Sequence, residues 1–318
     1  MLVLVAPGQG AQTPGFLTPW LELPGVEDRL REWSATSDLD LVHYGTEADA
    51  DDIRDTAVAQ PLLVASALIS ARQLFPTAAD LSRLAGAVAG HSVGELAACA
   101  LSGVAPEEQA VILARKRGLA MAEAAGLAET GMAALLGGEP EDVLPHLEKL
   151  GLTPANINGA GQIVAAGTAA QLAALAEDMP EGTRKVVRLK VAGAFHTAHM
   201  APAATALEAA AAELTVTDPH TRYVSNKDGQ VVSSGTEVVA RLVSQLVSPV
   251  RWDLCMETFK ELGVTALLEL APGGTLTGLA KRALPGVKTL ALKRPEDLDA
   301  ARELIAEHAT ESATSPTA

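Results

Sequence analysis

The chain has 318 residues and a mass of 32.7 kDa, which suits one large domain or one domain that carries a small insert. Hydrophobic residues make up 48% of it, so it can bury a sizeable core and is not intrinsically disordered. Its 24 Lys and Arg against 39 Asp and Glu give a net charge of −15, which argues against binding to nucleic acid or to an anionic membrane. No apolar run approaches the roughly 18 residues of a membrane span. Because the two cysteines also have no metal-ligand or disulfide spacing, we expect a cytoplasmic protein without a metal site.

Apolar runs separated by glycine and proline turns predict alternating strands and helices over most of the chain. In chain order these are a strand at 2–6, a helix at 61–75, a strand at 84–89, helices at 95–101 and 106–125, and strands at 222–225, 266–270 and 287–292. Repetition of strand, turn and helix is typical of an α/β domain with a mainly parallel sheet.

The middle of the chain has a different pattern. It predicts a strand at 132–137, a helix at 141–150, strands at 155–158 and 162–166, a helix at 169–179 and a strand at 184–191. The order βαββαβ indicates a ferredoxin-like unit. We therefore expect a small subdomain at 127–192, inserted into a discontinuous large subdomain at 1–126 and 193–308. The small polar residues of 309–318 predict a disordered tail.

A G-x-S-x-G pattern at Gly90-His-Ser-Val-Gly94 joins a predicted strand to a predicted helix. That is the setting of a nucleophile elbow, in which Ser92 would stand clear of the sheet and the Val93 N–H would face a developing oxyanion. The alternative is a glycine turn with a capping serine. The loop after the first strand would lie beside this elbow, and the Gln9 N–H there is a candidate second oxyanion donor, or else part of an ordinary tight turn.

A serine nucleophile needs a base, and two of the seven histidines are the best candidates. His196 and His199 follow the inserted subdomain directly, at a junction where clefts form. The side chain of His91 should diverge from that of its neighbour Ser92.

The basic triplet 115–117 lies in a helix that is apolar on nearly all sides. Three consecutive residues cover about 200° of a helix, so at least one basic side chain should face inward. An inward guanidinium suits a carboxylate ligand, whereas the alternative is a structural salt bridge. Periodicity alone does not choose between Arg115 and Arg117.

Several motifs taken together resemble the malonyl-CoA:acyl carrier protein transacylases. They are GQGAQ near the start, AQPLLVASA, GHSVGE, RKRGLAM, NINGAGQ, GAFHTAHM and QLVSPVRW, in matching order from the first strand to about position 292. The resemblance implies an α/β-hydrolase-like core with a ferredoxin-like subdomain. It also implies transfer of malonyl from malonyl-CoA to the phosphopantetheine thiol of acyl carrier protein, without a cofactor, in fatty acid or polyketide synthesis.

The resemblance implies a role for each matching residue. Ser92 would be the nucleophile, His196 its base and Arg117 the ligand of the malonyl carboxylate. The oxyanion positions would be Gln9 and Val93, the backbone carbonyl of Gln245 would orient the histidine, and the pocket would be lined by Gln60, Met121, Asn158 and Phe195. The chain departs from the common pattern at Ala11, Thr197 and His199.

Two other functions compete with acyl transfer. A serine esterase or thioesterase of the α/β-hydrolase type would need an acid, and Asp178 could pair with His196, but Asp178 lies inside the predicted insert, away from the expected cleft. A non-catalytic scaffold would leave the elbow without a purpose. For the carrier protein, alternation in the strand predicted at 184–191 places Arg184, Arg188 and Lys190 on one face, which would border the cleft as a basic docking patch or be merely solvated.

Overall fold

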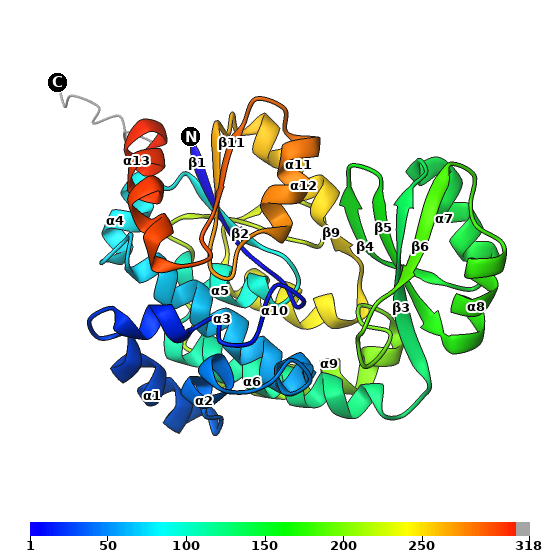
Figure 1. Cartoon of the computed structure of the whole chain (residues 1–318), viewed down its shortest axis with the longest axis horizontal. Helices are drawn as coiled ribbons and strands as arrows, with labels where there is room; N and C mark the ends of the chain where they lie inside the picture. Colours follow the sequence, from blue (N-terminus) through cyan, green and yellow to red (C-terminus); the bar gives the residue numbers. More distant parts are fainter. Residues whose placement is uncertain (310–318) are drawn as a thin grey trace.

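The computed structural model describes residues 1–309 and contains two sheets, each flanked by helices (Figure 1). The disordered tail was predicted at 309–318, and from residue 310 onward that prediction lies outside the described residues. None of the helices within 1–309 is long and apolar enough to cross a membrane.

The larger sheet is mainly parallel, as predicted. Its order is β11-β10-β1-β2-β7-β8, and every neighbouring pair is parallel except β7 and β8. The strands are β1 (Leu2–Ala6), β2 (Ala87–Gly90), β7 (Arg222–Val224), β8 (Val231–Val232), β10 (Ala266–Glu269) and β11 (Lys288–Ala291).

Helices cover both faces of this sheet. They are α1 (Val26–Ser37), α2 (Leu41–Thr46), α3 (Thr56–Arg72), α4 (Ala78–Leu84), α5 (Gly94–Leu101), α6 (Glu107–Ala125), α9 (Ala201–Ala211), α10 (Gly235–Ser244), α11 (Trp252–Glu261), α12 (Thr275–Ala283) and α13 (Leu298–His308). Short 3-10 helices are η1 (Thr18–Glu22), η2 (Asp52–Arg54), η3 (Ala198–Met200), η4 (Gln245–Val247) and η5 (Pro295–Asp297). Alternate residues of β1 enter two separate apolar clusters, with α3, α5 and α6 on one side and α11 and α12 on the other. A strand buried on both faces explains why residues 2–6 are apolar without alternation.

Several predicted elements differ by a few residues at their ends from the observed ones, and two of these differences have a clear cause. The helix predicted at 61–75 begins at Thr56, where the side chain of Asp55 caps it, so Pro61 lies inside it. A proline there cannot donate to the carbonyl four residues back. That carbonyl belongs to Ala57, and it accepts a hydrogen bond of 2.8 Å from Arg115 Nη1 instead, which explains why the helix tolerates Pro61. The strand predicted at 84–89 begins only at Ala87, because α4 runs to Leu84.

The smaller sheet has the order β6-β3-β5-β4-β9, and α7 and α8 cover its outer face (right in Figure 1). Its elements are β3 (Thr130–Gly137), α7 (Pro140–Lys149), β4 (Thr153–Gly159), β5 (Gln162–Thr168), α8 (Ala169–Glu177), β6 (Thr183–Arg188) and β9 (Val250–Arg251). The predicted succession of strand, helix, two strands, helix and strand is observed. The parallel pairing of β9 with β4 was not predicted, and it joins the two parts of the chain in one sheet.

Candidate functional site

Ser92 stands at a sharp turn between β2 and α5. A Cβ on Gly90 would lie 2.0 Å from the carbonyl carbon of Gly94, and one on Gly94 would lie 2.3 Å from the carbonyl oxygen of Ala6, so only glycine fits at either position. Ser92 itself has a φ of 53°, a left-handed conformation that residues with a side chain seldom adopt. The chain therefore forms the tight strand–turn–helix geometry that the G-x-S-x-G pattern predicts.

The side chain of Asn226, just beyond β7, holds the backbone on both sides of this turn. Its Oδ1 accepts a hydrogen bond of 2.8 Å from the Ser92 N–H, and its Nδ2 donates one of 2.7 Å to the carbonyl of Gly90. The two bonds stabilise the left-handed conformation of Ser92. Asn226 was not predicted, although it follows the strand next to β2, and polar residues in that position meet at one edge of a parallel sheet.

His196 lies beside the hydroxyl group of Ser92. Its Nε2 is 2.8 Å from Ser92 Oγ, and its Nδ1 is 2.8 Å from the backbone carbonyl oxygen of Gln245. Because a carbonyl can only accept a hydrogen bond, Nδ1 carries the proton and Nε2 is free to accept the serine proton. The hydrogen bond from Nδ1 to the Gln245 carbonyl is the contact that the family resemblance implied.

Burial, and secondarily the positive charge of Arg117, lower the pKa of His196 to about 3. The imidazole is therefore neutral at neutral pH, the state in which it can accept a proton. Since the charge of Arg117 opposes protonation, an anion that pairs with Arg117 would raise the pKa of His196.

The residues predicted to supply oxyanion donors, Gln9 and Val93, line the same pocket as Ser92. Within residues 1–309 neither backbone N–H donates a hydrogen bond. The side chain of Gln9 anchors its loop, because Nε2 donates to the carbonyl of Arg54 at 3.2 Å. Unused N–H groups in residues that line the pocket of a serine hydroxyl suit a developing oxyanion.

Arg117, rather than Arg115, faces inward and is 2% exposed. Its Nη1 donates to Gln60 Oε1 at 2.6 Å, and its Nη2 donates to Gln245 Oε1 at 2.8 Å and to Ser92 Oγ at 3.4 Å. These partners are neutral. Burial lowers the pKa of Arg117 to about 10, against the opposing effect of the negative charge on Glu95, and the guanidinium stays charged at neutral pH. A buried cation whose partners are neutral is suited to an anionic ligand.

Most of the predicted site residues share one pocket. Its lining includes Gln9, Gln60, Ser92, Val93, Arg117, Met121, Asn158, Phe195 and His196. Gln245, which the resemblance also implied, is not among the lining residues and lies behind Arg117 and His196. The opposite wall comes from the small sheet and the segment that follows it, through Met132, Ala134, Val164, Leu189 and Val191.

His91 points away from Ser92, as predicted. Its Nε2 is 2.8 Å from Asn158 Oδ1, and its ring packs edge-on against Trp252. Asn158 in turn donates to Gln162 Oε1 at 2.9 Å. The hydrogen bond between His91 and Asn158 connects the elbow to strand β4 of the small sheet.

The predicted basic patch does not border the pocket. Strand β6 ends at Arg188, so Lys190 lies beyond it, and Arg184, Arg188 and Lys190 are exposed and absent from the lining. Leu189 and Val191 face the pocket instead. Of the two alternatives for these basic residues, the solvated face is the one observed, because the apolar residues are turned toward the pocket.

Two other candidates lie away from Ser92. Asp178 follows α8 in the small unit, where its Oδ2 is 3.6 Å from His146 Nε2, so it is not the partner of His196 that a hydrolase triad would need. His199 is exposed to solvent, which leaves His196 as the histidine of the site.

Comparison with known proteins agrees with this geometry. A family model described as "Acyl transferase domain" matches residues 3–302. The malonyl CoA-acyl carrier protein transacylase of Mycobacterium tuberculosis H37Rv is 52% identical over 302 residues, which are 94% of this chain and 98% of that protein. The protein of the same name from Escherichia coli K12 is 33% identical over 306 residues, which are 94% of this chain and 98% of that protein.

Solved structures give the same result. The crystal structure of MCAT from Mycobacterium tuberculosis superimposes with a TM-score of 0.90 at 51% identity, covering 95% of this chain and 99% of that one. An acyl-carrier-protein-S-malonyltransferase from Bartonella henselae also gives a TM-score of 0.90, at 31% identity, covering 96% of this chain and 99% of that one. This chain therefore belongs to the acyl transferase domain family, together with the malonyl CoA-acyl carrier protein transacylases that it resembles along nearly its full length.

Proposed function

We propose that this protein transfers the malonyl group of malonyl-CoA to the phosphopantetheine thiol of acyl carrier protein, supplying extender units for fatty acid or polyketide synthesis. The observation that carries the proposal is the position of Arg117. A charged guanidinium with neutral partners lies 3.4 Å from a serine hydroxyl that is itself hydrogen-bonded to a neutral histidine. That arrangement fits an acyl group that ends in a carboxylate. The names of the relatives support the same reaction.

In the first half-reaction Ser92 Oγ attacks the thioester carbonyl of malonyl-CoA while His196 Nε2 takes its proton. The N–H groups of Gln9 and Val93 hold the oxyanion, and the carbonyl of Gln245 stabilises the imidazolium through Nδ1–H. The C–S bond then breaks, and the leaving thiolate of CoA takes the proton back from Nε2. The product is a malonyl ester of Ser92.

In the second half-reaction the phosphopantetheine thiol of acyl carrier protein gives its proton to His196 Nε2 and attacks the ester. Ser92 leaves with that proton, and the malonyl group is carried as a new thioester. The cycle is ping-pong and consumes neither metal nor cofactor. We retain the expectation of a cytoplasmic protein.

Arg117 couples substrate choice to basicity in this proposal. When the malonyl carboxylate pairs with Arg117, the positive charge that depresses the pKa of His196 is compensated, and the imidazole becomes a stronger base. An acyl group without a carboxylate does not provide that compensation.

The finer description of the fold belongs to the same proposal. The parallel sheet with Ser92 between β2 and α5 supports an α/β-hydrolase-like core, and the order β6-β3-β5-β4 supports a ferredoxin-like subdomain at 127–192 within 1–126 and 193–308. A hydrolase of this fold remains the competing function, because water in place of the thiol would give malonate.

Mass spectrometry of the intact protein after mixing with malonyl-CoA tests the function. We expect a malonyl adduct on Ser92 that persists in water and is discharged on adding acyl carrier protein, which gains the malonyl group. Rapid loss of the adduct to water would show a hydrolase, and no adduct would show that Ser92 is not a nucleophile.

A further inference from the structure

Glu95 is a buried acid that the proposed reaction does not use. It lies in the first turn of α5 and is 1% exposed. Burial raises the pKa of its carboxyl to about 7, while its hydrogen bonds and the charge of Arg117 act in the opposite direction. A buried ionisable group destabilises the folded protein unless its polar atoms have partners, so the contacts of Glu95 show what its burial is for.

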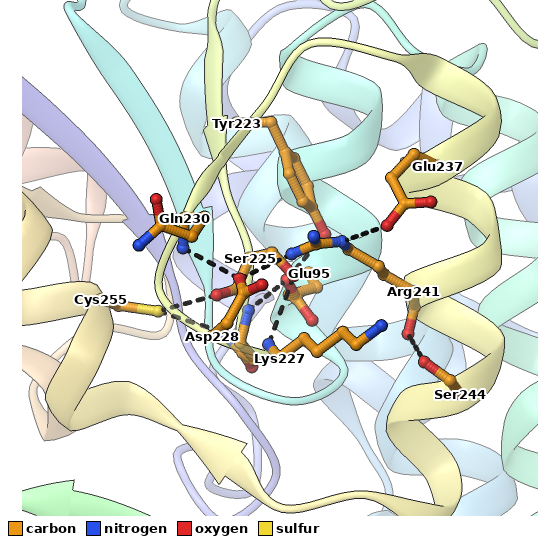
Figure 2. A network of polar contacts seen from close by, with 11 residues as sticks. Glu95, Tyr223, Ser225, Lys227, Asp228, Gln230, Glu237, Arg241, Ser244 and Cys255 are labelled. Carbon is orange, nitrogen blue, oxygen red and sulfur yellow. Dashed lines mark hydrogen bonds and ion pairs between the residues drawn. The ribbon is translucent and has the colours of Figure 1, made fainter.

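Each oxygen of the Glu95 carboxylate faces hydrogen-bond donors. Oε1 accepts from the Tyr223 hydroxyl at 2.8 Å and from the Asn226 N–H at 2.9 Å. Figure 2 shows the hydroxyl of Tyr223 directed at Glu95. Oε2 accepts from Nε2 of Gln245. The backbone and amide N–H groups can only donate, so the surroundings suit the ionised carboxylate.

These contacts fix the orientation of the Gln245 side chain. Its Nε2 donates to Glu95 and, at 3.1 Å, to the backbone carbonyl of Ser92, while its Oε1 accepts from Arg117 at 2.8 Å. A carboxylate and a carbonyl can only accept, so turning the amide round would place acceptor against acceptor on one side and donor against donor on the other. Glu95 thereby ensures that an acceptor faces Arg117.

Glu95 is also the negative charge that acts on Arg117, with the amide of Gln245 between them. A carboxylate in direct contact with the guanidinium would occupy its N–H groups and repel an incoming carboxylate. Through an intervening amide, the charge of Glu95 supports the cation while leaving it free to bind.

We propose that Glu95 is a positioning residue for the choice of acyl group, because it fixes the Gln245 side chain that holds Arg117 ready for the substrate's carboxylate. The inference rests on the proposed function, since it assumes that Arg117 binds the malonyl carboxylate. His196 is held by the backbone carbonyl of Gln245, not by its side chain. Glu95 should therefore affect selectivity more than the base itself.

The test is Glu95→Gln, assayed by kcat/KM for malonyl-CoA and for acetyl-CoA. The Asn226 N–H is fixed in the backbone and will claim the one oxygen of the new amide, so that the new NH₂ group faces the NH₂ group of Gln245. Gln245 must then shift or turn its side chain, and in doing so it also gives up its contact with the Ser92 carbonyl. Arg117 then loses an acceptor. One charge-assisted hydrogen bond corresponds to a fall of about 10- to 100-fold for malonyl-CoA, with acetyl-CoA within about 3-fold of the wild type.

Tyr223→Phe is the matched control, because it removes a donor from Oε1 and leaves the contact of Oε2 with Gln245 intact. Its ratio of malonyl to acetyl transfer should equal that of the wild type. An equal loss for both donors in Glu95→Gln, or no loss, would overturn the inference. A wild-type protein that does not transfer malonyl would instead refute the proposed function.

If Glu95→Gln does not fold, the swap that combines it with Gln245→Glu provides the test. The two side chains again match donor to acceptor with each other, which should restore most of the lost stability. The carboxylate at position 245 now faces Arg117 directly and offers no donor to the Ser92 carbonyl. Malonyl preference should stay at least about 10-fold below that of the wild type. Wild-type preference in a folded swap variant would overturn the inference.

Discussion

The two parts of the chain contribute different kinds of side chain to the same pocket. The large sheet and its helices supply the serine, the histidine and the arginine, whereas the small sheet and the segment after it supply mostly apolar groups. Ser92, His196 and Arg117 lie on one side, and Leu189 and Val191 lie on the other. The polar residues that the small sheet adds to the lining are Asn156, Asn158 and Gln162, and Asn158 is hydrogen-bonded both to His91 of the elbow and to Gln162.

The polar groups of the large part are joined by hydrogen bonds, whereas the apolar side chains of the facing wall make none. Gln245 by itself contacts Ser92 and Glu95 at the start of α5, Arg117 on α6 and His196. Removing one such group leaves its partners buried without hydrogen bonds, which costs about 1–3 kcal/mol per neutral group and more for a charge. An apolar wall loses only local contact area. Substitutions on the two sides should therefore differ in both size and kind.

Ser92→Ala should have the largest effect. Without the hydroxyl group no malonyl ester forms, and transfer should fall by about 10⁴-fold or more. Intact-protein mass spectrometry and a transfer assay measure both quantities. A malonyl adduct that survives in this variant would contradict the assignment of the nucleophile.

His196→Ala should lower kcat by at least about 10²-fold more than His199→Ala, since only His196 contacts Ser92 Oγ. Each variant removes one imidazole, and the two positions are three residues apart in the chain. His199→Ala therefore controls for the loss of an imidazole outside the pocket. Equal losses would mean that His199 belongs to the site despite its exposure.

Arg117→Ala should lower kcat/KM for malonyl-CoA by about 10²- to 10³·⁵-fold, because a carboxylate left buried without its cation costs about 3–5 kcal/mol. The amide oxygens of Gln60 and Gln245 that now accept from Arg117 would face the substrate and add repulsion. Acetyl-CoA has no carboxylate and should be spared. Kinetics with both donors measure the shift in selectivity.

Arg115→Ala is the control for that experiment. Its guanidinium bonds to the carbonyl of Ala57 that Pro61 leaves free, so its loss should lower the melting temperature and leave the malonyl-to-acetyl ratio unchanged. If Arg117→Ala lowers both donors equally in a folded protein, Arg117 is structural.

Local patterns predicted the parts of the site that depend on a few adjacent residues. The turn at Ser92 follows from two glycines and a serine between a strand and a helix, and β1 follows from an unbroken apolar run. Arg117 and Gln245 were assigned through resemblance, because periodicity left Arg115 and Arg117 equivalent. What separated them was the fold itself, which turns Arg117 toward Gln60 and Arg115 toward Ala57.

The parts that depend on contacts between distant segments were missed. The sole acid of the predicted helix 95–101 is Glu95, and that was a usable signal, but its partners Tyr223 and Gln245 lie more than a hundred residues away. The pairing of β9 with β4 rests on two residues from each strand, too few for a hydrophobic period to be recognised. The orientation of residues 184–191 stayed open between two alternatives, because alternation says which residues share a face, not which face is inward.

The buried acid should make stability depend on pH in a way that a neutral variant does not. A carboxyl whose pKa rises from 4.5 to about 7 on folding holds its proton more tightly in the folded protein. The contribution of Glu95 to the free energy of unfolding therefore falls as the pH rises from 4.5 to about 7, by up to about 3 kcal/mol.

Arg117 and the thiol of Cys99, with pKa values of about 10 and 12, do not titrate there, and burial raises the pKa of both Tyr223 and Cys255 further from it. Burial depresses the pKa of His196, which removes stability as the pH falls, and this contribution cancels between the two proteins. In urea unfolding, the stability of Glu95→Gln relative to the wild type should therefore increase from pH 4.5 to 7. A constant difference would mean that Glu95 stays ionised throughout.

The smallest effect should come from the wall. Leu189 is half-buried and lines the pocket, so Leu189→Ala removes part of an apolar contact worth about 1 kcal/mol, or less than about 10-fold in KM. A hydrocarbon carries no charge with which to distinguish a carboxylate from a methyl group, so malonyl and acetyl transfer should change together. Lys190→Ala, one residue further and directed to solvent, should leave serine acylation unchanged. If Leu189→Ala shifted the malonyl-to-acetyl ratio as far as Arg117→Ala does, the wall would take part in selection, and the division between the two sides of the pocket would not hold.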